Sequence, residues 1–331
     1  MSAFAGPAFE PLLALAPLTL VDIGARGGLQ PNWRPARPHL RVIAFEPDAD
    51  EHARLAKTGD PRDVHINAAV YRQPATVTLN VTRSPGASSL YEPNFAFLSR
   101  FPDARRFEVV KRTEIRAQPL DDLLRAQGIA DVDFIKIDAQ GAEFPILEGA
   151  RETLATRAFG VEVEVQFAPL YRGQSRFGDV HALMETLGYA LLDLRPANWK
   201  RAVGAGVGKP KGQLVFGDAL YLKSPAAFAD TLARLEAPAR GAKLARAIGV
   251  CLLYGYVDYA LELLDLHGGA FDAGAAAAIR ESLRSDMPLS ARVPHFPGKG
   301  TLAQFFYRLS RALEPSVGGW ATGGRHLGNL D

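Results

Sequence analysis

The sequence predicts an α/β fold built on a largely parallel sheet, followed by a helical C-terminal part. Short β-rich runs alternate with helical stretches from residue 18 to about 222, and no strand-like run is recognisable after Lys223. Such alternation is typical of sheets covered by helices on both faces. With 331 residues, of which 47% are hydrophobic and 22% charged, the chain is long enough for one large domain or two.

Composition excludes several classes of protein. With 38 Lys and Arg against 36 Asp and Glu, the net charge of +2 gives no argument for a nucleic-acid or anionic-membrane partner. The single cysteine, Cys251, forms no internal disulfide or cysteine metal cluster and suits a reducing compartment. The 11 uncharged residues between Glu10 and Asp22 are interrupted by Pro17 and too few to span a bilayer. We therefore expect a cytoplasmic protein without a membrane span or secretory signal.

Seven apolar, β-rich runs are predicted as strands of the sheet. They are Leu18–Ile23, Leu40–Phe45, Val64–Val70, Asp133–Ile137, Gly160–Phe167, Tyr189–Leu194 and Leu214–Leu222. Between them, Asp48 begins a helix that reaches Lys57, and a second helix is predicted over residues 142–154. Both helices should cover faces of the sheet.

One segment departs from this alternation. Residues 71–74 separate Val70 from a further predicted strand, Ala75–Thr82, and predict a hairpin that joins the two. The polar residues 83–89 then form a loop of a length that is often functional in compact domains. This loop is either a lid over a substrate or a solvated connection, and the sequence leaves both open.

After Lys223 the signals are helical. Ser224 is a predicted N-cap, and Pro225 occupies the first helical position. Helices are predicted near 225–236, 242–266 with a break at Gly255, 272–285 and 301–313. We therefore divide the chain into a domain over residues 1–223 and a helical region over 224–331, which we expect to serve packing or homo-oligomerisation rather than catalysis.

An apolar strand leads into a glycine-dense turn at residues 18–28. Gly24, Gly27 and Gly28 let the backbone approach a ligand, because a Cβ would occupy the ligand's volume or forbid the dihedral angles. The dinucleotide pattern G-x-G-x-x-G would place its first glycine where this chain has Asp22. A carboxylate at that position repels pyrophosphate but can pair with an amino group, which favours S-adenosylmethionine over NAD.

Polar residues also end the next two predicted strands. Glu46 follows Asp22 by 24 residues, close to the spacing at which an acid commonly accepts hydrogen bonds from ribose hydroxyls. Asn67 either contacts adenine or caps its strand. The order and spacing of the three signals predict a nucleoside-bearing cofactor.

Buried parallel strands are usually apolar throughout, yet two predicted strands carry charges. The two-residue period places on one face Lys136 and Asp138 of the first strand, and Glu162, Glu164 and Gln166 of the second. If the strands are neighbours, Lys136 can pair with Glu162 or Glu164. The residues form either a structural ion-pair network or a ligand pocket at the carboxyl ends of the strands.

Five segments carry a family resemblance: DIGARGG at 22–28, FEP at 45–47, LDDLL at 120–124, FIKIDAQGAE at 134–143 and LEGA at 147–150. They resemble the FkbM family of S-adenosylmethionine-dependent methyltransferases, over roughly residues 18–222. The resemblance implies the class I methyltransferase (Rossmann-like) fold, with a seven-stranded, mostly parallel sheet whose last strand is antiparallel. It also implies methylation of a hydroxyl group, since family members act on sugars of cell-surface glycans and on secondary metabolites.

The resemblance also implies roles for single residues, according to their positions in the matching motifs. The resemblance implies that the turn from Asp22 to Gly28, with Gly24, Arg26 and Gly27, holds the methionine portion of the cofactor. It places the ribose at Glu46, the adenine near Asn67 and the methyl-transfer centre near Asp138. Two features depart from the family: Gln140 replaces the common acid of its motif, and the proline-rich segment after Gly28 is too short for the usual long first helix.

The sequence therefore predicts an O-methyltransferase that acts on a hydroxyl of a sugar, glycan or secondary metabolite, with a base that removes the hydroxyl proton. Asp138 is the first candidate for the base and Glu164 the second, while Lys136 holds either in place or polarises the substrate oxygen. No metal is required by the spacing. Two alternatives stay open: an inactive methyltransferase-like scaffold that binds partners through its helical region, and an NAD-dependent nucleotide-sugar enzyme.

Overall fold

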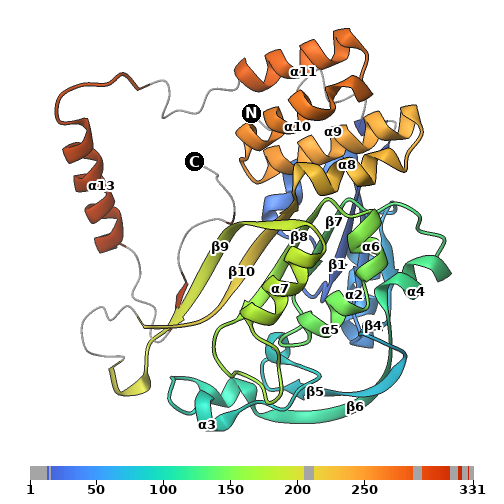
Figure 1. The fold of residues 1–331 in the computed structure, drawn as a ribbon. Coiled ribbons are helices and arrows are strands. Elements are labelled where there is room, and N and C mark those ends of the chain that lie inside the picture. The colour runs from blue at the N-terminus through green and yellow to red at the C-terminus, as the bar shows by residue number, and fades with distance from the viewer. Residues whose placement is uncertain are drawn as a thin grey trace.

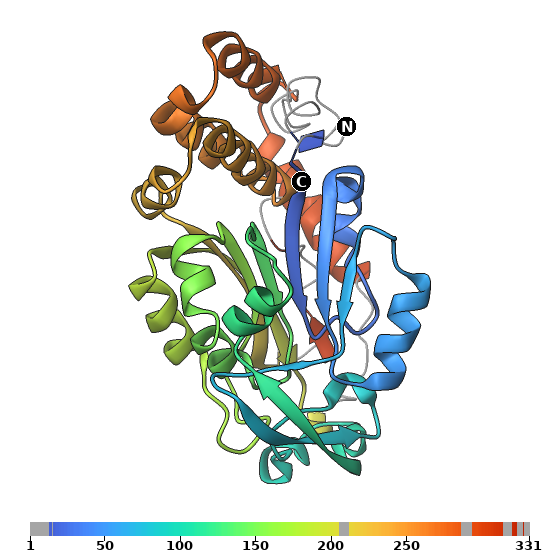
Figure 2. The same ribbon diagram turned by 90° about the vertical axis from the view of Figure 1, so that its right-hand side faces the viewer.

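The computed structural model describes residues 13–14, 16–204, 212–285, 293–313, 320–322 and 327. Its main sheet has the strand order β11-β9-β10-β8-β7-β1-β2-β3, and helices cover both faces (Figures 1 and 2). The strands are β1 (Leu18–Ile23), β2 (Leu40–Phe45), β3 (Val64–Ile66), β7 (Phe134–Ile137), β8 (Gly160–Gln166), β9 (Tyr189–Trp199), β10 (Gln213–Lys223) and β11 (Trp320–Thr322).

The directions of the strands confirm the predicted fold class. Strands β3, β2, β1, β7 and β8 run parallel to one another, and β10 runs antiparallel to both of its neighbours, β8 and β9. Without β11, this is the seven-stranded sheet with an antiparallel last strand. The expectation of a purely helical C-terminal part was wrong at β11, which pairs with the edge of β9. A strand of three residues is too short to show a periodic pattern.

Two groups of helices cover the sheet. The face that carries Leu20 and Phe134 packs against η2 (Pro31–His39), α2 (Ala49–Thr58), α8 (Pro225–Ala233), α9 (Ala237–Leu253) and α10 (Val257–His267). The face that carries Val21 and Ile135 packs against α4 (Leu120–Ala126), α5 (Glu143–Glu148), α6 (Arg151–Thr156) and α7 (Phe177–Thr186). The helix predicted over 142–154 is thus two short helices, α5 and α6.

Three further strands form a small second sheet in the order β4-β6-β5: β4 (Ala69–Val70), β5 (Ala75–Thr82) and β6 (Val109–Gln118). The prediction of a hairpin between Val70 and Ala75 was wrong, because β4 and β5 do not pair with each other. β4 pairs parallel with one edge of β6, and β5 pairs antiparallel with the other edge of β6. The predicted run 64–70 is also divided between the two sheets. A hydrogen bond from the Ala68 amide to the Ile66 carbonyl bends the chain between β3 and β4.

The start of the first C-terminal helix and the break at Gly255 are confirmed, whereas α9 begins at Ala237, five residues before the predicted start at 242. The Ser224 side chain accepts a hydrogen bond from the Ala227 amide at the start of α8, and Gly255, with φ of +79°, separates α9 from α10. The segment after Gly28 was predicted to be too short for a long first helix. In the described chain it forms the 3-10 helix η2 instead.

Aromatic side chains join the sheet to this C-terminal region. The ring of Phe134 in β7 lies 4.9 Å from that of Trp33 in η2 and 5.4 Å from that of Tyr254 after α9. All three side chains are buried. Helix α9 therefore packs directly on the sheet, where the short η2 leaves the face open.

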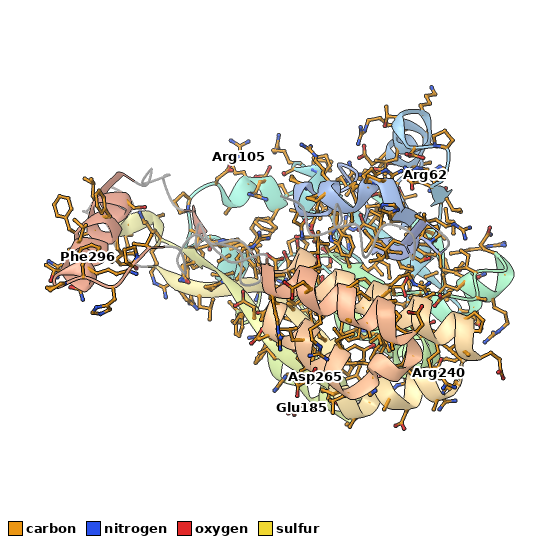
Figure 3. The ribbon with its side chains drawn as sticks, turned by 90° about the horizontal axis from the view of Figure 1, so that it is seen from above. Arg62, Arg105, Glu185, Arg240, Asp265 and Phe296 are labelled. Atoms are coloured by element: carbon orange, nitrogen blue, oxygen red, sulfur yellow. The ribbon has the colours of Figure 1, made fainter. Side chains whose placement is uncertain are left out.

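Two further helices follow, α11 (Ala273–Ser285) and α13 (Lys299–Leu313). Helix α13 stands apart from the rest of the molecule in two perpendicular views (Figures 1 and 3). Among the described residues, no helix is both long enough and apolar enough to cross a bilayer.

Candidate active site

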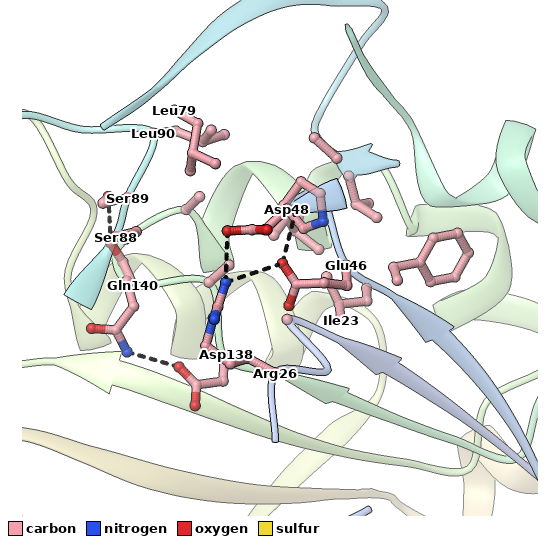
Figure 4. A pocket seen from close by; sticks show the side chains of 18 of the residues that line it. Ile23, Arg26, Glu46, Asp48, Leu79, Ser88, Ser89, Leu90, Asp138 and Gln140 are labelled. Atoms are coloured by element: carbon pink, nitrogen blue, oxygen red, sulfur yellow. Dashed lines mark hydrogen bonds and ion pairs between the residues drawn. The ribbon is translucent and has the colours of Figure 1, made fainter. Parts of the chain in front are cut away.

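A cavity of about 210 Å³ opens at the carboxyl ends of β1, β2 and β7 (Figure 4). Its wall is made by the turn after β1, the acids after β2, the loop 83–89 and the turn after β7. The polar side chains on this wall include Arg26, Glu46, Asp48, Ser89, Asp138 and Gln140. Open α/β sheets bind ligands at this edge, so the cavity is the candidate active site.

Gly24 brings two of these turns together. Its φ is +78°, and a Cβ at this position would lie 2.0 Å from the carbonyl oxygen of Asp138. Its amide donates a hydrogen bond of 3.0 Å to the carbonyl of Phe45 at the end of β2. The predicted glycine turn is therefore needed for close contact between the chain segments that end β1, β2 and β7.

Asp22 does not line this cavity. The two-residue period of β1 places it on the opposite face from Ile23, which does line it. The Asp22 carboxylate is buried and lies 3.3 Å from Nζ of Lys136. Burial raises its pKa, while the charge of Lys136 acts in the opposite direction. Asp22 borders a second cavity, of about 290 Å³, together with Gly27 and Gly28.

Glu46 and Arg26 meet at the cavity wall. Glu46 is 4% exposed, and its carboxylate accepts a hydrogen bond of 2.9 Å from the Asp48 amide. Burial raises the pKa of Glu46. The Arg26 guanidinium lies 3.0 Å from the Asp48 carboxylate and 3.9 Å from those of Glu46 and Glu51. Glu51 also pairs with Arg54 at 2.7 Å, so three acids face two cations, and this part of the wall suits a cationic or hydroxyl-rich ligand.

Asn67 supports Glu46 from outside the cavity. Its side-chain amide donates a hydrogen bond of 2.8 Å to the backbone carbonyl of Glu46. Asn67 is exposed and does not line the cavity, whereas Ala68, Ala69 and Val70 after it do. Its predicted contact with adenine stays a prediction.

Asp138 is the candidate base that reaches the cavity. Its side chain is 41% exposed, and Oδ1 accepts a hydrogen bond of 2.8 Å from the Gln140 amide. Gln140 adopts a φ of +52°, a strained value for a residue other than glycine. The turn is held by the buried Glu143, whose carboxylate accepts hydrogen bonds from the amides of Ala139 and Gly141 at 2.9 to 3.0 Å. Burial raises the pKa of Glu143 to about 7.

Lys136 and Glu164 lie behind Asp138 and do not line the cavity. The prediction that Lys136 pairs with Glu162 or Glu164 was wrong: its Nζ lies within 4 Å of Asp22 and Asp138, and of neither glutamate. The cause is the position of β7 between β1 and β8, which lets the side chain turn toward β1. Burial lowers the pKa of Lys136, but the surrounding carboxylates outweigh burial and raise it.

Glu164 is buried among other polar groups. One of its oxygens accepts hydrogen bonds from the side-chain amides of Gln166, at 2.6 Å, and Gln140, at 3.3 Å. Burial, reinforced by the charges of Asp138 and Glu143, raises the pKa of Glu164 well above its ordinary value. Asp138 lines the cavity and Glu164 does not, so the geometry favours Asp138 as the base.

The loop 83–89 packs over the cavity rather than into solvent. The Ser89 hydroxyl donates a hydrogen bond of 2.6 Å to the Gln140 carbonyl. The phenol of Tyr171 is 2.9 Å from the carbonyl oxygen of Ala87 and 3.1 Å from the side-chain oxygen of Gln140. Pro85, a further residue of the loop, lines the cavity. Of the two interpretations that the sequence left open, these contacts favour the lid.

Sequence reasoning missed the contributions of Tyr171 and Tyr254. Tyr171 is only 1% exposed, and its phenol holds the lid by a hydrogen bond to the Ala87 carbonyl. Tyr254 donates a hydrogen bond of 2.7 Å to the buried carboxylate of Glu162 on β8. No sequence pattern links these distant positions. The described residues contain no group of three or more potential metal ligands.

Comparisons with known proteins agree with this picture. The family model for the methyltransferase FkbM domain matches residues 22–191, just over half of the chain. The 2-O-methyltransferase NoeI of Sinorhizobium fredii is 24% identical over 161 residues, which make up 47% of this chain and 66% of that protein. The aligned part is thus slightly less than two thirds of that relative's length.

Among solved structures, the methyltransferase FkbM from Methylobacillus flagellatus KT has 17% sequence identity and a TM-score of 0.35, over 62% of this chain and 43% of that one. The precorrin-6y C5,15-methyltransferase from Geobacter metallireducens GS-15 has 16% identity and a TM-score of 0.33, over 65% of this chain and 86% of that one. On the match of the family model over residues 22–191, the chain belongs to the FkbM family of methyltransferases.

Proposed function

We propose that this chain is an S-adenosylmethionine-dependent O-methyltransferase whose acceptor is a hydroxyl group of a sugar, a glycan or a secondary metabolite. The observation that carries the proposal is that Glu46 and Asp138 share one cavity at the carboxyl edge of a methyltransferase-type sheet. Membership of the FkbM family supports the reaction, and the name of the relative NoeI, a 2-O-methyltransferase, supports oxygen as the acceptor atom.

The residues of the cavity fit this cofactor. Glu46 presents a buried carboxylate to which ribose hydroxyls can donate hydrogen bonds. Glu46, Asp48 and Glu51 outnumber Arg26 and Arg54, the cations that pair with them, and this excess of acid favours a ligand with cationic groups and without phosphate. When bound, S-adenosylmethionine supplies a methyl group on a positively charged sulfur.

Asp138 is the proposed base. Its Oδ1 is held by Gln140, which orients the carboxylate and leaves its other oxygen to face an acceptor hydroxyl. Asp138 would accept the proton of the acceptor hydroxyl when its oxygen receives the methyl group that the cofactor supplies. Nζ of Lys136 lies 3.9 Å from the Asp138 carboxylate, and Glu164 helps to position Gln140 by accepting a hydrogen bond of 3.3 Å from its side-chain amide.

Calorimetric titration with S-adenosylmethionine and with S-adenosylhomocysteine tests the proposal. We expect both to bind the wild-type chain, and Glu46→Gln to weaken binding by about tenfold or more, because a charge-assisted hydrogen bond contributes about 1.5–3 kcal/mol. Glu92→Gln is the matched control, since Glu92 is an exposed acid outside the cavity. Absence of heat with either ligand would favour the scaffold alternative, and binding of NAD instead would favour the oxidoreductase alternative.

A further inference from the structure

Helix α13 (Lys299–Leu313) carries an apolar side that is open to solvent. Leu302, Phe305, Phe306 and Leu309 are 46%, 60%, 57% and 44% exposed, respectively. At about 100° per residue, these four side chains fall within an arc of about 100° around the helix. Helices of globular proteins normally bury such a stripe against a core.

No part of the chain that the structure describes covers this helix. Every described side chain from residue 300 to residue 310 is exposed, including those on the apolar side. The rings of Phe305 and Phe306 contact each other edge to face, with centroids 5.6 Å apart. In Figures 1 and 3 the helix lies away from both sheets and from the other C-terminal helices.

The charge of the segment has one sign. Lys299, Arg308 and Arg311 lie in the helix, and residues 293–313 contain no Asp or Glu. This local excess contrasts with the net charge of +2 for the whole chain. At about 100° per residue, Lys299 and Arg308 flank the apolar arc, about 20° beyond Phe306 on one margin and about 60° beyond Phe305 on the other. The helix therefore carries basic residues along both margins of an apolar side that contains two phenylalanines.

We propose that α13 binds the surface of an anionic membrane. Basic amphipathic helices with aromatic and leucine residues on their apolar side lie in the plane of the bilayer interface, where anionic headgroups attract their Lys and Arg side chains. At about 1.5 Å per residue the helix is roughly 22 Å long, which is shorter than the hydrocarbon core of a bilayer. It lies on the membrane and does not cross it.

The same charges make it unfavourable for a second copy of this chain to cover the apolar side of α13. Packing two α13 helices through their apolar sides would bring the cations of both together, and residues 293–313 offer no acid to compensate for them. An anionic lipid surface supplies the opposite charge and an apolar layer together.

Vesicle co-sedimentation of the full chain tests the proposal. The probes are vesicles of phosphatidylcholine alone and vesicles that contain about one third phosphatidylglycerol. We expect the chain to sediment with the anionic vesicles only, and to be released by salt of about 0.5 M. The double substitution Phe305→Glu and Phe306→Glu should weaken this binding at least about tenfold. The matched control is Leu266→Glu, which changes a leucine that is 59% exposed on α10.

Circular dichroism of each variant establishes that it is folded, and light scattering measures the mass in solution. Failure of the wild-type chain to bind anionic vesicles at low salt overturns the proposal, as does equal binding by the double variant. The proposal is also overturned if the wild-type chain forms a dimer and does not bind vesicles, while the double variant is a monomer. That result would show that a second copy of the chain covers the apolar side of α13. None of these readouts depends on methyl transfer.

Discussion

The phenol of Tyr254, from the C-terminal region, donates a hydrogen bond of 2.7 Å to the carboxylate of Glu162 in the middle of the main sheet. Glu162 is 3% exposed and lies beside Lys136 in the register of β7 and β8. A second buried contact joins the same parts of the chain, since Lys243 in α9 lies 2.7 Å from the carboxylate of Asp133 just before β7. The helices after Lys223 and the sheet therefore share one core.

We expect Lys243→Ala to destabilise the whole chain. The substitution leaves the buried carboxylate of Asp133 with one cation fewer, and breaking a buried ion pair typically costs about 3–5 kcal/mol. Arg246, which also contacts Asp133, lowers this cost toward the smaller value. Urea unfolding measures the change, with the exposed Lys57→Ala as control. A loss no greater than that of the control would contradict the structural role of this pair.

A chain truncated after Lys223 should fail to unfold cooperatively. Leu220 and Phe134 pack in the same apolar cluster as Leu244 and Ile248 of α9, so removal of the helices exposes the face of the sheet. Thermal unfolding followed by circular dichroism makes the comparison with the full chain. A cooperative transition in the truncated chain would instead show that residues 1–223 form an independent domain.

Gly24→Ala should impair the candidate site far more than Gly27→Ala. Both glycines have positive φ, so both substitutions strain the backbone. The new Cβ at Gly24 would meet the Asp138 carbonyl at 2.0 Å, whereas at Gly27 nothing lies within 4 Å. We expect Gly24→Ala to weaken S-adenosylhomocysteine binding at least about tenfold further than Gly27→Ala. Equal affinities in calorimetry would show that the close contact does not shape the cofactor site.

The buried carboxyl groups predict a fall in stability as the pH rises. Burial raises the pKa of Glu143 and Glu162 to about 7, from an ordinary value of 4.5. Between these values the folded chain binds more protons than the unfolded chain, so the free energy of unfolding decreases from about pH 5 to pH 7. For one such group the decrease approaches about 3 kcal/mol. Urea unfolding across this range should show it, with a shallower slope in Glu162→Gln; an unchanged slope would contradict the assignment.

Asp138→Asn tests the proposed base. An amide cannot accept the hydroxyl proton, so we expect kcat to fall about 100-fold or more while cofactor affinity changes little. Glu164→Gln is the comparison, because Glu164 lies outside the cavity; the kcat of this variant should fall much less. Rates measured with a methyl acceptor, once one is found, decide between the two. Near-normal turnover of Asp138→Asn would remove Asp138 from the role.

The sequence predicted those strands and helices whose ends are set by neighbouring residues. The strands β1 and β2 begin and end where their apolar runs do, Asp48 caps α2, and Ser224 begins α8. β6 escaped prediction, because Lys, Arg and Glu interrupt its apolar residues and most of its side chains are exposed. Without β6 as the strand between them, β4 and β5 looked like a hairpin.

In the candidate site, too, the features set by local sequence were predicted and those set by tertiary packing were not. Gly24, Glu46 and Asp138 were predicted because each ends a recognisable strand, and all three line the cavity. The partner of Lys136 depends on which strands are neighbours and on the direction its side chain takes, and neither is visible in the sequence. The link between Tyr254 and Glu162 spans 92 positions and depends on tertiary packing alone.

A crystal structure of the chain soaked with S-adenosylhomocysteine tests the central claim most directly. We predict the nucleoside in the cavity between Gly24 and Glu46, with the ribose hydroxyls on the Glu46 carboxylate and the sulfur on the side of Asp138. Density in the second cavity beside Gly28, or a bound nucleoside that leaves Glu46 paired only with Arg26 and the Asp48 amide, would contradict the account.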